Sequence, residues 1–566
     1  MALLFRRSKV TRSLPFNLPI ELNPRSRKMD KVLHENELIT DVLVAGGGMS
    51  GVACALSAAR NGAKVILCQD RPVLGGNASS EIRMHVVGAN SSRPCADLKL
   101  EARESGIVEE IRLANSIRNA QRSPSMFDFI LYDKCCAEEN LTLMLNTTVS
   151  GVEMADASIK QVEALRLSTE DRFTITAKQY VDCTGDSTLA AAAGAACLEG
   201  REDKEQFGES LAQDEADHKS LGSTLLFMGR KHDKPMPFTA PSWARKFTED
   251  DFKLRPHATG DVDFGLEYGF WWIEWGGQFD TIRQNEMIRH ELLAIVMGIW
   301  DHIKNDGDHG AEYWALDWFG AVPGKRESRR LIGHHILNEN DLVSSKAFPD
   351  AIAYGGWPMD LHPPEGVDRP EEPPCVQNKL PWIYDIPLGC CVARDIDNLM
   401  FAGRNISATH VAFASTRVMA TCALVGEGVG ATAAYAVAND LSPNAIRESE
   451  SAMRAVQQLL LRQDAYLIGQ ELRDERDLAL SATITAPSET EQGPASNVVS
   501  GQNRAMQDPR GVPAERGISG THRWISEAIG DTPGWVELRW SEAVELNRIE
   551  LVFDSALHRY LTLSQS

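Results

Sequence analysis

Three glycines near the amino terminus have the spacing of a phosphate-binding turn. Gly46, Gly48 and Gly51 follow an apolar run, 41–45, and precede an Ala-rich segment of helical character, 50–61. A strand, a tight turn and a helix bring backbone N–H groups and the positive helix end to one point, which suits a pyrophosphate. Gly46 then permits the turn, Gly48 lets the phosphate approach, and Gly51 lets the helix pack on the strand. A purely structural turn in another α/β protein is the alternative.

Two residues after the next apolar run are candidates for holding the ribose of a dinucleotide. Gln69 closes the run 64–68 at a position where a carboxylate is usual, and Asp70 follows it. Gln69 can donate and accept hydrogen bonds toward a ribose hydroxyl, and Asp70 can reach the same group, so both stay candidates. The pair Gly75-Gly76 soon afterwards favours a flavin nucleotide, because such a pair brings the backbone close to the pyrophosphate.

The densest charged segment of the chain, 325–330 (KRESRR), has the composition of an anion clamp. Arg326 and Arg329 could each hold a carboxylate or phosphate through paired hydrogen bonds. The alternative is a solvated helix start in which Glu327 pairs locally. His410 follows a later glycine turn and is a candidate acid or base, with a structural histidine as the alternative.

Aromatic and basic residues elsewhere suggest further contacts with ligands. Arg83 and His85 follow the second glycine pair, so they could lie at the edge of a flavin, and His85 could attach it covalently. Trp271, Trp272 and Trp275 could stack against a sugar, although packing in a domain core is the favoured interpretation.

Two more strand–turn junctions are expected beside the first one. A predicted strand ends at Thr184-Gly185-Asp186, and another ends at Gly403-Arg404-Asn405. In an open parallel sheet the carboxyl ends of the strands lie at one edge, where ligands bind. A Gly-interrupted helix, 415–440, then completes the fold. Because residues 200–390 separate these parts and are rich in Trp, His and Pro, we predict a discontinuous domain with an insertion.

Composition restricts the class of protein. The 566 residues are 43% hydrophobic and 24% charged, as in a protein with a large core, and the net charge of −21 argues against a nucleic-acid binder. No apolar stretch follows Arg6-Arg7 and no run of 18 apolar residues occurs, so we expect no export signal, no membrane span and a cytoplasmic location. Eleven cysteines, an odd number without a C-x-x-C motif, favour reduced thiols over disulfides or an iron–sulfur cluster, and we expect no metal.

Six ordered motifs across residues 38–470 carry a resemblance to a known family. The motifs VAGGGMSG, QDRPVLGGNASSE, DCTGD, PGKRESRRLIG, DAIAYGGWPMD and MFAGRNISATHVAFASTRVMATCALVGEGVG resemble the FAD-dependent oxidoreductase family. That family is often labelled xanthan-lyase-like and is distantly related to fumarate reductase flavoproteins and to the flavin domain of heterodisulfide reductase. The sequence departs from its pattern at Glu427-Gly428, where Gln-Ala is usual, and it lacks the cysteine cluster motifs of the heterodisulfide reductases.

The resemblance implies FAD as cofactor and a redox reaction. Together with the glycine turns it assigns cofactor binding to Gly46, Gly48, Gly51, Gln69, Asp70, Arg71, Gly75, Gly76, Val149, Thr184, Gly185, Asp186, Gly403, Arg404, Asn405, Gly426 and Gly430. Arg326, Arg329 and His410 are the catalytic candidates. Residues 482–566 also resemble part of a discoidin-like jelly roll, because WVELRW and NRIELVF alternate as strands do; the chain ends before such a fold would normally finish.

We therefore predict an α/β protein with a Rossmann-like FAD-binding domain, an inserted α+β cap or substrate domain, and a C-terminal β-sandwich, a partial jelly roll. The expected boundaries are a flexible basic leader (1–37), the FAD-binding domain (38–200 and 391–445), the cap (201–390), a helical segment (446–481) and the β domain (482–566).

The expected activity is hydride transfer between flavin and a small polar substrate, with sugar-derived compounds as the candidate class. An electron-transfer flavoprotein with a redox partner protein and a carbohydrate-binding protein with an inactive flavin fold are the alternatives.

Overall fold

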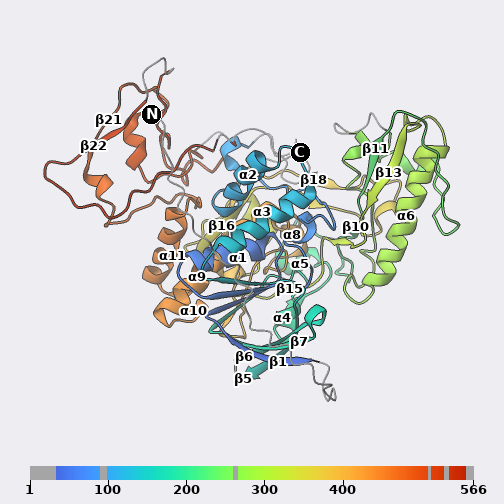
Figure 1. Ribbon diagram of the computed structural model, residues 1–566, viewed down its shortest axis with the longest axis horizontal. Coiled ribbons are helices and arrows are strands. Elements are labelled where there is room, and N and C mark those ends of the chain that lie inside the picture. Colours follow the sequence, from blue (N-terminus) through green and yellow to red (C-terminus); the bar gives the residue numbers. More distant parts are fainter. Residues whose placement is uncertain are drawn as a thin grey trace, which may run out of the picture.

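The computed structural model describes residues 33–89, 98–258, 265–507, 511–527, 534–555 and 557. Most of the expected leader, residues 1–32, lies outside this part of the chain. The molecule has a central body, a lobe containing helix α6 on one side, and a smaller lobe formed by the C-terminal segment on the other (Figure 1).

A five-stranded parallel sheet forms the centre of the body. Its strands lie in the order β20-β8-β2-β3-β4, and every neighbouring pair is parallel. The strands span Leu399–Phe401, Gln179–Asp182, Val42–Ala45, Val65–Cys68 and Leu141–Met144. All the residues of β2, β3 and β8 are buried, as expected for apolar strands covered on both faces. This sheet confirms the predicted parallel α/β architecture, with its last strand contributed after the insertion.

Two helices pack closely against each other beside this sheet. Helix α1 (Met49–Arg60) follows β2, and α9 (Met419–Asn439) follows β20. A Cβ atom on Gly426 or Gly430 would collide with the carbonyl oxygens of Ser50 and Cys54 on α1. These two glycines therefore set the distance between the helices. Among the described helices, α9 alone has the length and composition of a membrane span, but 89% of that stretch is buried inside the molecule, which makes it a core helix.

A second sheet lies below the body in Figure 1. Its order is β1-β7-β6-β5, with spans His34–Ile39, Asp171–Thr176, Ser158–Arg166 and Thr148–Ala155. Helices α2 (Ile107–Arg118) and α3 (Pro124–Ala137) connect β3 to β4 through the body. Strand β1 begins at residue 34, inside the expected leader, and pairs with β7 in parallel.

The inserted lobe has its own core. Strands β11 (Phe227–Lys231) and β13 (Trp314–Phe319) pair, and the long helix α6 (Asn285–Asn305) lies beside them. Phe227 and Trp300 meet edge to face with ring centroids 5.2 Å apart. Small sheets join the lobe to the body: β12 (Glu274–Trp275), β10 (Ser223–Thr224) and β14 (Gly324–Lys325) form one, and β15 (Arg330–Leu331) pairs with β9 (Cys197–Leu198).

Two further antiparallel pairs lie outside these sheets. Strand β16 (Ala351–Gly355) pairs with β19 (Tyr384–Pro387), and β17 (Met359–Leu361) pairs with β18 (Val376–Asn378). The remaining helices are α4 (Thr188–Ala192), α5 (Lys204–Phe207), α7 (Glu339–Val343), α8 (His410–Thr416), α10 (Pro443–Glu448) and α11 (Glu450–Arg462).

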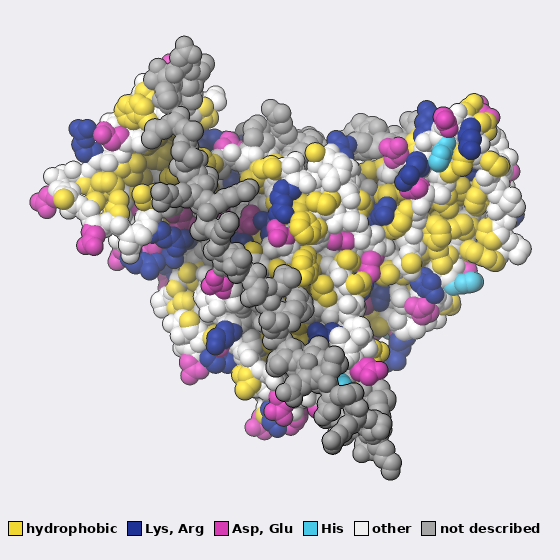
Figure 2. Space-filling view, in the orientation of Figure 1, with side chains coloured by type: hydrophobic (Ala, Val, Ile, Leu, Met, Phe, Trp, Pro, Cys, Tyr) yellow, Lys and Arg dark blue, Asp and Glu magenta, His cyan; other side chains and the backbone are white. Residues whose placement is uncertain are grey.

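The C-terminal segment differs from the predicted β domain. Its described strands are β21 (Thr483–Thr485) and β22 (Glu537–Arg539), which pair with each other. The expected strand over 547–553 is not formed there, and its apolar side chains are exposed. Figure 2 shows hydrophobic side chains gathered on this lobe. Met506 and Val512, by contrast, are buried in the core of the body. The described residues therefore show part of this segment packed on the body and no β-sandwich.

Candidate active site

A cavity of about 900 Å³ opens at the carboxyl edge of the parallel sheet. The residues that end or follow its strands line the wall, among them Ala45, Cys68, Cys183 and Gly403. Residues of the inserted lobe line the opposite side, including Tyr268. The cavity thus lies where ligands bind in open parallel α/β sheets, between the cofactor fold and the insertion.

The glycine turn after β2 forms one end of this cavity. Gly46 has a φ of 97°, and a Cβ atom there would collide with the Cys183 carbonyl, so only glycine fits. Helix α1 has Gly48 at its N-cap, no side-chain cap and no acidic residue in its first turn. Gly48, Met49 and Ser50 line the cavity, so the open N-terminus of α1 can bind an anion. Gly51 does not line the cavity. It packs against Gly46 and Cys183, which confirms the predicted close contact between helix and strand.

The two ribose candidates differ in what their side chains already do. Gln69 accepts a hydrogen bond at Oε1 from the Gly47 N–H (2.7 Å) and donates one from Nε2 to the Val73 carbonyl (3.2 Å). Its buried amide therefore holds the glycine turn in place. Asp70 also lines the cavity, with a side chain that is 57% exposed. These contacts favour Asp70 as the group that meets a ribose.

The turn after β8 is fixed by an ion cluster. Asp186 accepts from Lys325 Nζ (2.6 Å) and from Ser328 Oγ (2.9 Å), and it also pairs with Arg404. Burial opposes ionisation of Asp186, but Arg404 and Lys325 outweigh it and hold its pKa below the usual range. Because Lys325 comes from the insertion and Arg404 from the turn after β20, the cluster locks three segments around the cavity.

Most of the expected cofactor positions line this single cavity. They are Gly46, Gly48, Gln69, Asp70, Arg71, Gly75, Gly76, Val149, Thr184, Gly185, Asp186, Gly403 and Arg404. Besides Gly51, three others are placed elsewhere. Gly426 and Gly430 lie between α1 and α9, and Asn405 is buried with its Nδ2 donating to Asp182 (3.2 Å to Oδ1). The two glycines allow α1 and α9 to pack closely, and Asn405 links the turn after β20 to the end of β8.

The residues present fit an FAD molecule. The cavity combines an uncapped helix N-terminus, glycine backbone on two sides (Gly48 and Gly75 form a parallel bridge) and a carboxylate at the ribose position. A Cβ on Gly48 would meet nothing nearer than Gly76 Cα at 4.0 Å, so space for a phosphate stays open there. The pyrophosphate would lie on the α1 turn, with Asp70 toward the adenosine.

A charged cluster forms a second part of the cavity wall. His362 is held between two carboxylates: its Nδ1 lies 2.8 Å from Glu274 and its Nε2 lies 3.1 Å from Asp360. Arg326 pairs with Glu274 at 3.2 Å, and Arg417 pairs with Asp360 at 3.0 Å. Arg326, Asp360, His362 and Arg417 all line the cavity. The two guanidinium groups and the imidazole offset two carboxylates, so an anionic or strongly polar ligand can approach.

The protonation of this cluster follows from its contacts. Burial by itself disfavours a charged His362, but Glu274 and Asp360 overcome that effect and raise its pKa above the usual value. Burial likewise works against ionised Glu274 and Asp360, yet the neighbouring cations keep both pKa values low. Arg417 Nη2 lies 3.0 Å from His362 Nε2. That nitrogen can therefore donate a hydrogen bond to Asp360 when protonated or accept one from Arg417 when neutral, so His362 has a partner in both protonation states.

The two arginines of the cluster differ in their free donors. Arg326 donates to Thr224 Oγ1 and to the Trp271 carbonyl (3.0 Å), so the protein already uses its guanidinium. Arg417 has a buried Nε without a hydrogen-bond partner among the described residues. Both side chains line the cavity, so Arg417 joins Arg326 as a candidate for holding an anionic ligand.

The other two catalytic candidates do not reach the cavity wall. His410 is buried, with Nδ1 2.9 Å from Glu327, and its backbone N–H donates to Glu202. Arg329 donates from Nε to the Asp186 carbonyl (3.0 Å) and supports that turn. The structural interpretation of His410 therefore fits its surroundings, and the segment 325–330 contributes side chains to different networks.

Aromatic residues line the cavity near the charged cluster. His85 stacks on Tyr268 at 3.7 Å, and burial lowers the pKa of His85 to about 3, so its ring stays neutral. Trp271 lines the cavity and meets His362 edge-on at 5.8 Å. Trp272 and Trp275 belong to the core of the inserted lobe, as expected. Arg83 lies over the Trp318 ring instead of lining the cavity.

Sequence reasoning missed Glu274, Asp360, His362 and Arg417 as site residues. They come from β12, β17 and the segment between α8 and α9, so no local spacing joins them. Asp360 and Arg417 do lie inside two of the motifs that carried the family resemblance, and that was the available signal.

Comparison with known proteins identifies a family for this chain. The family model described as "FAD dependent oxidoreductase" matches residues 41–460. No curated protein matches the chain. Solved structures that are similar include a geranylgeranyl bacteriochlorophyll reductase-like protein from Thermoplasma acidophilum, 11% identical, with a TM-score of 0.35 and 76% of this chain and 86% of that chain covered. Another is p-nitrophenol 4-monooxygenase PnpA from Pseudomonas putida DLL-E4, 10% identical, with a TM-score of 0.35 and coverages of 76% and 91%. The family match ends at residue 460, so the discoidin-like resemblance stays an expectation.

Proposed function

Since the chain belongs to the FAD dependent oxidoreductase family, we propose that it uses FAD to oxidise or reduce a small, hydroxylated acid of the sugar-acid class. The observation that carries the proposal is the cluster around His362, which lies on the wall of the same cavity as the glycine turn. A nucleotide on the turn and a polar substrate at the cluster would share this space.

The protein supplies positioning and a proton route. When bound, FAD supplies the two-electron redox chemistry. Arg417 would orient the substrate through a carboxylate, because its side chain lines the cavity beside His362. Trp271 offers a flat apolar face to the carbon skeleton. His362 Nε2 would take the proton of a substrate hydroxyl in the oxidative direction and return it in the reductive one, with Glu274 fixing the ring through Nδ1.

The test is anaerobic reduction of the purified holoprotein by a panel of sugar acids and their matched neutral sugars. Reduction is followed by the loss of oxidised-flavin absorbance. We expect at least one acid to reduce the flavin faster than its neutral counterpart, and Arg417→Lys to remove that preference, because lysine lacks the planar fork. Arg394→Lys, on an exposed arginine, is the control and should leave the preference unchanged.

The proposed substrate class would be contradicted if no compound of the panel reduced the flavin while a chemical reductant still did. Equal rates for acids and neutral sugars would contradict the role of Arg417. Reduction only in the presence of a partner protein would support an electron-transfer flavoprotein instead.

A further inference from the structure

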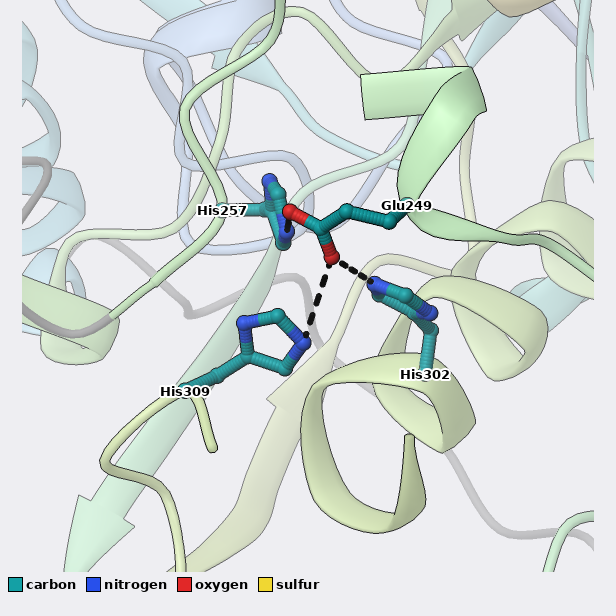
Figure 3. A group of neighbouring side chains, drawn as sticks. All are labelled: Glu249, His257, His302 and His309. Atoms are coloured by element: carbon teal, nitrogen blue, oxygen red, sulfur yellow. Dashed lines mark hydrogen bonds and ion pairs between the residues drawn. The ribbon is translucent and has the colours of Figure 1, made fainter. Parts of the chain in front are cut away.

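Four potential metal ligands converge in the inserted lobe, and none of them lines the cofactor cavity. They are Glu249, His257, His302 and His309 (Figure 3). Glu249 starts a short 3-10 helix (Glu249–Phe252), His302 lies in the last turn of α6, and the other two histidines lie in loops. The three histidine rings face the carboxylate of Glu249 from different sides in Figure 3.

The distances between the four side chains resemble those of a tetrahedral site. Glu249 Oε2 lies 3.3 Å from His302 Nε2 and 3.8 Å from His309 Nε2, and Oε1 lies 3.5 Å from His257 Nε2. All four ligand atoms lie within 4.8 Å of one another. A tetrahedral metal with bonds of ~2.0–2.1 Å separates its ligand atoms by about 3.3 Å. Small movements of the side chains would therefore close the site.

A neighbouring group orients one of the rings as metal sites require. His257 Nδ1 lies 3.0 Å from the Arg255 carbonyl, so a proton on Nδ1 directs the Nε2 lone pair toward the cluster. A carbonyl partner of this kind fixes the tautomer of a metal-binding histidine. His302 Nδ1 lies 3.7 Å from Asp306 Oδ2, beyond hydrogen-bond distance. His309 Nε2 also lies 2.8 Å from the Asp306 carbonyl, and metal binding would exchange that contact for a metal bond.

The three histidine rings are largely screened from solvent. The three histidine side chains are 2–9% exposed, whereas Glu249 is 69% exposed. Phe252 packs against His257 and His302 with ring centroids 4.7 and 4.9 Å away. The cluster therefore combines three screened imidazoles with one carboxylate that is open to solvent.

We propose that these four residues bind one divalent transition metal, with Zn²⁺ the ion that best suits three imidazoles and a carboxylate in tetrahedral geometry. The ion would tie the 3-10 helix and two loops to α6. It would also brace the cavity, because Pro256, next to His257, lines the cavity wall and accepts a hydrogen bond from Trp272 Nε1 (2.9 Å). The alternative is an ion pair between Glu249 and a protonated histidine, without a metal.

The experiment measures metal in the full-length protein. After purification with Zn²⁺ present and extensive dialysis, elemental analysis should find about one zinc per chain. A chelator should remove it and lower Tm by at least about 2 °C, since ligands of the native state stabilise it. Replacement by Co²⁺ should give the visible absorption bands of a tetrahedral site, a readout that needs no variant and no enzyme activity.

Two variants and a control localise the metal. His302→Ala should lose the zinc and the chelator effect. Glu249→Gln changes an exposed side chain, so it should fold normally and bind Zn²⁺ at least tenfold more weakly. His290→Ala, on an exposed histidine of the same helix, should keep full zinc content. FAD content, measured in parallel, should stay unchanged in Glu249→Gln.

Absence of stoichiometric zinc in the wild type, with no Co²⁺ bands and no chelator effect, would overturn the proposal. Zinc content in Glu249→Gln and His302→Ala equal to that of the wild type, at limiting Zn²⁺, would also overturn it. Neither result bears on the proposed redox activity, which the flavin experiments test separately.

Discussion

Gly48 is the residue at which cofactor binding and folding can be separated. Its Cβ position opens into the cavity, so the side chain of Gly48→Val has room in the empty protein but would occupy the phosphate position. We expect this variant to fold with a Tm close to that of the wild-type apoprotein and to retain less than a tenth of the wild-type FAD content. Extraction and chromatography of the bound flavin measure this. Gly151→Val, in β5 away from the cavity, is the control. Full FAD content in Gly48→Val would place the cofactor elsewhere.

Glu427, the residue that departs from the family pattern, should make stability depend on pH. It is fully buried on α9 and accepts a hydrogen bond from the Ile107 N–H (2.9 Å), and burial raises its pKa to about 8. A carboxyl with a raised pKa in the native state stabilises the fold fully below its unfolded pKa near 4.5. That contribution is lost as the pH rises toward 8, at about 1.4 kcal/mol per unit of pKa difference.

Glu427→Gln keeps the acceptor and removes the ionisation. We expect the variant and the wild type to have similar stabilities near pH 4.5, and the variant to be the more stable at pH 8. Urea unfolding across this range checks the prediction, with the exposed Glu448→Gln as control. A difference that does not change with pH would show that Glu427 ionises freely.

The residues predicted from sequence were those that share a short local motif. Gly46 and Gly48 lie where the strand–turn–helix pattern places them, because backbone geometry alone defines that turn. His362 and Arg417 were not predicted as site residues, since their contacts join segments that are distant in the sequence. His410 was placed near the flavin by its distance along the chain, but α8 directs it toward Glu327.

Among the elements, the parallel sheet was predicted from its buried apolar runs. The strand predicted over 547–553 is not formed in the described structure. The alternation over 547–553 predicts a strand only if another strand pairs with it. In the described structure Ile549, Leu551 and Phe553 are 76%, 70% and 81% exposed, and this segment has no strand partner among those residues. An alternating pattern shows that a segment is able to form a strand. The strand forms only where another strand pairs with it.

The first part of the C-terminal segment is expected to contribute to the stability of the body. Met506 and Val512 are buried in its core, and Arg516 pairs with Asp385 at 2.6 Å. Ending the chain after residue 481 would leave Asp385 buried without its cation and would open the core, so we expect a lower Tm and partial loss of FAD. Ending it after residue 527 removes β22 but keeps these contacts, and it should be tolerated. Thermal unfolding of the two truncations compares them directly. Equal stability of both with the full chain would show that the segment is independent.

On the scale of the whole molecule, the site exists because an insertion closes over a nucleotide fold. Lys325 from the insertion binds Asp186 after β8, and Arg326 beside it joins Glu274 and the charged cluster. The sequence predicted both parts and their order along the chain. It did not predict which residues of the insertion face the cavity, because that depends on how the lobe docks. On the face shown in Figure 2, acidic and basic side chains are interspersed, although the net charge is −21.

The most direct measurement of the central claim is the rate of flavin reduction in His362→Gln. The holoprotein is mixed anaerobically in a stopped-flow instrument with the sugar acid that reduces the wild type, across a range of pH. The wild-type rate should rise with pH through a value above 6.5, because Glu274 and Asp360 raise the pKa of His362 and oxidation needs the neutral ring. His362→Gln should keep its FAD, lose that pH dependence and react about 10²–10⁴-fold more slowly. A variant that binds FAD and is reduced at the wild-type rate with the same pH profile would show that His362 carries no proton in the reaction.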